Sequence, residues 1–307
     1  MTDGNRTLHV LIALTFTLMV AVVMLSAYMR LSATGLGCDN WPDCYGRILA
    51  GHAPHRPEWI NIAHRIAASA MGLAALAIAT LAWRLRRTAH RNFPLALALF
   101  GLTAFLAALG KWTHDARLPA VALGNLLGGL GMLLLLWRMH LGYSPQTAAP
   151  SGLRGWIRIG LMLVAAQAAL GGMTSANFAV SSCAGLNGCE GWLQHATLAA
   201  FNPFHYLGVT QEGSFVPGAT QQTLHMAHRL LALPVVAYLV WLGIGLFREK
   251  WRRSGQLLIA VAALQVALGI GAATGNPPLF LVLLHNAAAA FLLLALLTFS
   301  YRPRDPT

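Results

Sequence analysis

Eight apolar runs, each about 20 residues long, determine what this chain can fold into. A helix needs about 20 apolar residues to cross the hydrocarbon core of a bilayer. Backbone groups in that core must be hydrogen-bonded within their own segment, and runs of this length achieve that as helices. We therefore predict an all-α integral membrane protein with eight transmembrane helices. The runs cover residues 8–29, 60–83, 93–111, 118–137, 157–175, 224–247, 256–274 and 279–300.

Composition supports the same class of protein. Hydrophobic residues make up 57% of the 307 residues and charged residues only 10%, well below the share in soluble domains. The net charge of +12 comes from short basic clusters between the apolar runs, a pattern of membrane topology rather than of nucleic-acid binding. The first run exceeds a signal-peptide core and lacks a small-residue cleavage site, so we expect no cleavable signal.

The basic clusters also predict the orientation in the membrane. With the N-terminus inside, 14 of the 21 lysines and arginines fall in cytoplasmic segments, and the long segment from about 176 to 222 holds none. The positive-inside rule then places both termini in the cytoplasm and the cysteine-bearing loops on the outer side. The cytoplasmic set is Arg6, Arg84, Arg86, Arg87, Arg91, Arg138, Arg154, Arg158, Arg248, Lys250, Arg252, Arg253, Arg302 and Arg304.

The chain reads as one four-helix unit used twice, over residues 1–150 and 151–307. An even number of crossings separates the two units, so they are predicted to be parallel repeats about an axis along the membrane normal. A small-molecule transporter could be built in the same way, and the repeat alone assigns no function. The matched features are Cys38-x5-Cys44 with Cys183-x5-Cys189, His64-Arg65 with His228-Arg229, and Pro119 with Pro277-Pro278.

The four cysteines all lie in the two long outer segments and could pair in three ways. Because exported compartments favour disulfides, the simplest pairing is Cys38–Cys44 with Cys183–Cys189. A zinc site is the weaker interpretation, since no histidines are arranged around the pairs as in a zinc finger. A short surface disulfide can also be labile, so redox activity stays open beside a structural role.

Three histidines are the main candidates for chemistry, because an imidazole inside a membrane span is costly unless it has a partner. His64, His228 and His285 are predicted to lie at similar depth on the outer side. In the second unit, His228 and His285 come from different helices and could face each other across the bundle. Two neutral imidazoles approaching from opposite sides form the axial ligation of a low-spin haem. The alternative for each is a hydrogen bond to a neighbouring helix.

An arginine directly follows both His64 and His228, and we call each such pair a His-Arg doublet. Arg65 and Arg229 could bind a haem propionate, since arginine binds carboxylates well. Interfacial snorkelling explains the same positions equally well.

The first unit differs at the position that matches His285, where alignment of the repeats places Asn125. Asparagine is a poor iron ligand, so a haem held by His64 would have an open or weak second side, which suits chemistry or substrate exchange. Acidic residues lie outside the helix centres, which argues against a proton pump with buried carboxylates. We also predict a helix lying on the outer membrane surface within 192–201.

With these residues in view, the sequence resembles the haem A synthases of bacteria and mitochondria over nearly its whole length. The resemblance rests on the stretch Tyr28-Met-Arg-Leu-Ser-Ala-Thr-Gly-Leu-Gly-Cys-Asp-Asn-Trp-Pro-Asp-Cys44, the two His-Arg doublets, the second cysteine pair and His285. It implies eight helices in the bacterial inner membrane, with haem b as cofactor in the C-terminal unit and haem O as substrate in the N-terminal unit. One methyl group of haem O would be oxidised to the formyl group of haem A for cytochrome oxidase.

By that resemblance, His228 and His285 would ligate haem b, and His64 would be an axial ligand of the substrate haem. Implied partners are the lipid bilayer, a haem O synthase and a membrane electron donor or acceptor, while the oligomeric state, including a homo-oligomer, stays open.

Two positions depart from the family pattern. Asn61 stands where the family usually has a glutamate, and Asn125 stands where it usually has a histidine. These departures support an alternative hypothesis, a non-catalytic haem-binding or electron-transfer membrane protein or an oxidase-assembly factor.

Overall fold

The computed structural model describes most of the chain. The described residues are 3–31, 57–87, 92–111, 118–143, 149–150, 152–183, 185, 188–208, 218–273 and 279–301.

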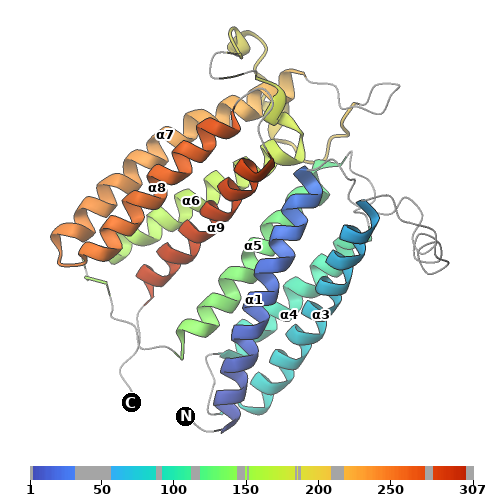
Figure 1. The fold of residues 1–307 in the computed structure, drawn as a ribbon, viewed down its shortest axis with the longest axis vertical. Coiled ribbons are helices and arrows are strands. Elements are labelled where there is room, and N and C mark those ends of the chain that lie inside the picture. The colour runs from blue at the N-terminus through green and yellow to red at the C-terminus, as the bar shows by residue number, and fades with distance from the viewer. Residues whose placement is uncertain are drawn as a thin grey trace. The chain divides into compact units, whose positions relative to one another are not determined.

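Eight long helices dominate the described residues, and each is long and apolar enough to cross a membrane (Figure 1). This confirms the predicted all-α, eight-helix membrane fold. The ends agree with the predicted runs to within five residues, and the largest differences are at α1 and α7, which each begin five residues before the predicted starts of 8 and 224. The helices are α1 (Asp3–Leu31), α3 (Pro57–Arg84), α4 (Asn92–Gly110), α5 (Pro119–Leu141), α6 (Arg154–Ala176), α7 (Ala219–Arg248), α8 (Arg252–Ala272) and α9 (Leu279–Ser300).

Large apolar side chains cover the outside of these helices. Leu14, Leu73 and Met162 are 65%, 71% and 69% exposed, although each lies well inside a span. Exposed apolar surface on this scale is unusual for a water-soluble monomer. It is the surface that lipid chains would cover.

The chain divides into two compact units, residues 1–116 with 124–144 and residues 117–123 with 145–307. In the first unit, α3 packs against both α1 and α4. Glycines bring α5 close to its neighbours: a Cβ on Gly128 would lie 2.5 Å from Cδ2 of Leu106 in α4, and one on Gly129 would lie 3.3 Å from Cγ2 of Val23 in α1. Small residues at such contacts let membrane helices approach closely.

In the second unit, α6, α7, α8 and α9 form a closed ring in which each helix contacts the next and α9 contacts α6. The backbones of α7 and α8 come together at Gly243 and Gly255, where a Cβ on Gly255 would clash with the carbonyl oxygen of Gly243. The phenol of Tyr238 donates a hydrogen bond of 2.8 Å to the carbonyl oxygen of Trp156 and so links α7 to α6. Residues that point to the middle of this ring are therefore enclosed by four helices.

The segment between α6 and α7 contains short 3₁₀ turns, η1 (Ala179–Ser181), η2 (Trp192–Gln194) and η3 (Leu198–Phe201). The predicted surface helix within 192–201 is therefore wrong. Thr197 adopts an extended conformation between η2 and η3, and its hydroxyl accepts a hydrogen bond from the amide of Ala199. A threonine in this role ends one turn and starts another, because its side chain competes with the helical backbone for the amide.

Candidate functional site

His228 on α7 and His285 on α9 meet inside the second unit. Their ring centroids lie 6.4 Å apart, and the ring planes are inclined at 79°. Both α7 and α9 lie between α6 and α8 in the ring of helices, so the two imidazoles approach each other from opposite sides of the bundle. The structure thus brings together two of the histidines that the sequence indicated.

The separation fits two ligands of one metal ion. A metal–imidazole bond is about 2 Å long and the ring nitrogen lies about 1 Å from the ring centre, so two opposed ligands have centroids about 6 Å apart. Within the described residues, no group of three or more His, Cys, Asp or Glu side chains could hold a metal ion. A haem supplies four equatorial nitrogens of its own and needs only two axial ligands, so the donor set fits a haem better than a bare ion.

Buried polar atoms around the pair also fit a polar ligand. In the described part of the protein, Nδ1 of His285, Nδ2 of Asn286 and Nδ1 of His225 are buried without a hydrogen-bond partner. Such atoms are rare in proteins and need an explanation. His225, only 4% exposed and one turn before His228, was not predicted as a site residue, although the spacing His225-x2-His228 was visible in the sequence.

Two glutamines hold the histidine rings. Nε2 of Gln167 on α6 donates a 2.9 Å hydrogen bond to the carbonyl oxygen of His228 and lies 3.0 Å from Nδ1 of the same residue. Nε2 of Gln265 on α8 lies 3.2 Å from Nε2 of His285. Neither glutamine was predicted, although each lies more than ten residues after the start of its span.

Two glycines make room for the same rings. A Cβ on Gly171 would lie 2.9 Å from Cε1 of His228, and a Cβ on Gly269 would lie 3.1 Å from Cε1 of His285. Each glycine is one turn beyond the glutamine of its helix. Each imidazole therefore rests on the backbone of the preceding helix.

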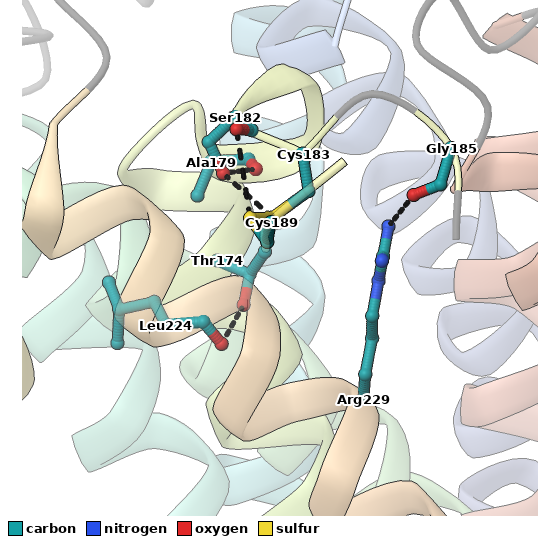
Figure 2. Close-up of a disulfide and its surroundings, with 8 residues drawn as sticks. All are labelled: Thr174, Ala179, Ser182, Cys183, Gly185, Cys189, Leu224 and Arg229. Atoms are coloured by element: carbon teal, nitrogen blue, oxygen red, sulfur yellow. Dashed lines mark hydrogen bonds between the residues drawn. A yellow bond between two sulfur atoms is a disulfide. The ribbon is translucent and has the colours of Figure 1, made fainter. Parts of the chain in front are cut away.

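Arg229 follows His228 and reaches the segment between α6 and α7. Its Nη2 donates a 3.0 Å hydrogen bond to the carbonyl oxygen of Gly185, which lies inside the ring closed by the disulfide Cys183–Cys189 (Figure 2). Thr174 links α6 itself to α7, since its hydroxyl lies 3.0 Å from the carbonyl oxygen of Leu170 on α6 and 3.4 Å from that of Leu224 on α7 and can donate to either. The second predicted disulfide is thus present and joined to α7 beside His228, whereas Cys38 and Cys44 lie outside the described residues.

The first unit contains the other predicted site residues. Asn61 and His64 are three positions apart on α3 and share a face of that helix. Asn61 is 5% exposed, and its side-chain oxygen is buried without a hydrogen-bond partner among the described residues. Asn125 is partly buried on α5, and Arg65 follows His64 on α3. Their roles toward a substrate stay predictions.

A separate cluster in the first unit joins α1 to the end of α5. Nε2 of His9 lies 3.1 Å from Nδ1 of His140, and the ring of Tyr143 stacks on His9 at 4.9 Å. Asn92 donates a 2.7 Å hydrogen bond to the hydroxyl of Tyr143. Burial raises the pKa of Tyr143, and this hydrogen bond partly offsets the rise.

Known proteins resemble this chain over nearly its whole length. Residues 9–297 match the COX15-CtaA family, described as cytochrome oxidase assembly protein. The chain belongs to this family. It is 34% identical to a haem A synthase of Shewanella oneidensis over 94% of both chains. It is 25% identical to haem A synthases of Caulobacter sp. and Caulobacter vibrioides, over 99% of this chain and 98% of each relative. The match to the family covers both units, and the predicted membership in the haem A synthase family is confirmed.

Proposed function

We propose that this protein is a haem A synthase-type oxidoreductase of the bacterial inner membrane that acts in haem A biosynthesis for cytochrome oxidase. Its reaction converts one methyl group of haem O into the formyl group of haem A. The observation that carries the proposal is the pair His228 and His285, 6.4 Å apart inside a four-helix unit of a chain related to haem A synthases.

The second unit is the site of the resident cofactor. His228 and His285 would hold a haem b, which would supply one-electron transfer. Arg229 lies beside His228, where its guanidinium can bind a propionate, and its hydrogen bond to Gly185 fixes part of its side chain.

The first unit is the site of the substrate. His64 would bind the iron of haem O on one side, and Arg65 lies next to it for a propionate. Asn61 places an unsatisfied oxygen one turn away on the same face of α3, where it can accept a hydrogen bond from a hydroxylated substrate group. Asn125 stands where a second ligand would be expected from the repeat, so this site lets its haem enter and leave more easily.

Oxidation of a methyl group to a formyl group takes up the oxygen of one water molecule and releases four electrons and four protons. A haem b held by His228 and His285 would supply one-electron transfer out of the substrate site, and an oxidant carried in the membrane would take up the four electrons. A haem O synthase would deliver the substrate.

The test of the cofactor assignment is the absorption spectrum of the purified protein. We expect a low-spin haem spectrum that is lost in His228→Ala and in His285→Ala and is retained in His64→Ala. A spectrum unchanged in the first two variants would contradict the assignment.

The second candidate function is a non-catalytic haem-binding or electron-transfer protein of oxidase assembly. It is favoured by Asn61 and Asn125, which replace the glutamate and histidine usual in the family. It predicts the same bis-histidine spectrum without conversion of haem O.

A further inference from the structure

The two histidines of the second unit are held by the same device, repeated on two helices. On α6 the device is Gln167 with Gly171, and on α8 it is Gln265 with Gly269. In each case the glutamine amide nitrogen lies 3.0–3.2 Å from a ring nitrogen, and the glycine one turn later leaves the space in which the ring lies. The repetition on two helices with different partners argues against an accident of packing.

The glutamines occupy positions where an amide is costly. Their side-chain oxygens are both buried without a hydrogen-bond partner among the described residues. A polar side chain inside a membrane bundle is destabilising, and a buried oxygen without a hydrogen-bond partner adds to the destabilisation. Leucine or methionine would fill the same space at lower cost, so the amides serve something other than packing.

The first unit lacks this device. The helices α1 and α4 are the counterparts of α6 and α8 in the repeat, and neither contains a glutamine. The amides are therefore confined to the unit in which the two histidines meet.

We propose that Gln167 and Gln265 are positioning residues that fix the rotation of the His228 and His285 rings and so hold the two ring planes near perpendicular. The inference rests on the proposed function, in which these rings are the axial ligands of a haem. An imidazole ligand can rotate about its bond to the metal, and a hydrogen bond donated by its second nitrogen, which carries the proton, fixes the ring orientation. The side-chain oxygens of Gln167 and Gln265, buried without a partner among the described residues, would accept these protons once each amide turns about its last bond. Without haem, each amide nitrogen instead donates to an unprotonated ring nitrogen, and Gln167 also donates to the carbonyl oxygen of His228.

The angle between the planes gives the proposal a direct readout. Low-spin ferric haems with perpendicular imidazole planes show a more anisotropic electron paramagnetic resonance spectrum, with a larger maximum g value, than haems with parallel planes. Rings held at the observed 79° would give the anisotropic type when a haem is bound between them. When an amide is removed, its ring can turn, and the maximum g value should fall.

The experiment uses the haem-loaded, full-length protein with Gln167→Met, Gln265→Met and the double variant. Methionine keeps the approximate volume and removes the hydrogen bonds. The matched control is Gln256→Met, which makes the same change at an exposed position near the start of α8. We expect each single variant to lower the maximum g value, the double variant to lower it further, and the control to leave it unchanged. Loaded variants with the wild-type spectrum would overturn the proposal.

A second measurement needs no haem. Nitrogen-15 resonances of labelled histidine rings report which ring nitrogen carries the proton and which accepts a hydrogen bond. In the haem-free protein, Gln167→Met should shift the ring signals of His228 only, and Gln265→Met those of His285 only. Unchanged signals would overturn the proposal even where a variant fails to load haem. A wild-type protein that binds no low-spin haem contradicts the proposed function instead, and the ring signals then still decide whether the glutamines position the rings.

Discussion

Gly171 on α6 and the ring of His228 on α7 are in such close contact that a single added carbon would collide with the imidazole. A Cβ at Gly171 would lie 2.9 Å from Cε1 of His228, closer than real Cβ contacts. The ring lies at the centre of the proposed cofactor site, so it cannot move away without changing the angle at which it meets His285. The glycine thus contributes to the site without carrying any chemical group.

Gly171→Ala should therefore lower the low-spin haem content of the purified protein by at least about tenfold, because the collision displaces the ring by more than a ligand bond tolerates. Overpacking of this kind costs about 1–3 kcal/mol. The ratio of haem absorbance to protein absorbance measures the effect. Gly155→Ala is the matched control on the same helix, since nothing lies within 4 Å of its added carbon. Equal haem content in the two variants would show that the contact with Gly171 does not constrain the ring of His228.

Gly269→Ala tests the other ring. Its added carbon would lie 3.1 Å from Cε1 of His285, slightly farther than in the Gly171 case, so we expect a smaller loss of haem. Haem titration of the detergent-solubilised variant gives the affinity. A loss larger than that of Gly171→Ala would contradict this order.

The disulfide Cys183–Cys189 should stabilise the protein by about 2 kcal/mol, the value that chain entropy gives for closing so short a loop. Both cysteines are buried, at 0% and 6% exposure, so the bridge belongs to the packed part of the segment. We expect Cys183→Ala to lower the thermal unfolding midpoint, and Cys183→Ala/Cys189→Ala to lower it by nearly the same amount. The two changes break one interaction, so their effects should not add. Additive losses would mean that the cysteines act separately.

Asn61 should matter to the substrate but not to the resident haem. Asn61→Leu removes the buried, unsatisfied oxygen beside His64, and we expect the rate of haem O conversion to fall about tenfold, a change of about 1.4 kcal/mol. The low-spin haem spectrum should stay as in the wild type. Asn61→Glu is the comparison, since it keeps an acceptor oxygen at the residue type usual in the family. Conversion of haem O by Asn61→Leu at the wild-type rate would show that Asn61 has no role in the substrate site.

Much of the fold followed from the sequence because hydrophobicity decides membrane spans almost independently of tertiary contacts. Even α9, whose His285 interrupts an apolar run, was predicted with the ends that the structure gives, Leu279–Ser300. The meeting of His228 and His285 could also be anticipated, because the repeat and the matched depth of the residues restrict where they can lie.

The contacts of Gln167 and Gln265 with the two histidine rings could not be predicted from the sequence in the same way. Whether Gln167 faces His228 depends on the rotation and depth of α6 relative to α7, and no pattern within α6 records either quantity. The turns within 192–201 were missed for a different reason. A run of apolar residues suggested a helix there, but the hydroxyl of Thr197 accepts a hydrogen bond from the amide of Ala199 and interrupts the helix.

The measurement that tests the central claim most directly is chromatography of haems extracted from membranes that contain this protein and a source of haem O. The account predicts haem A, together with its hydroxylated precursor, from the wild-type chain, and their loss in His64→Ala while the low-spin haem remains. Only haem O and haem B in the wild-type extract, beside an intact bis-histidine spectrum, would contradict it and leave a haem-binding protein without this activity.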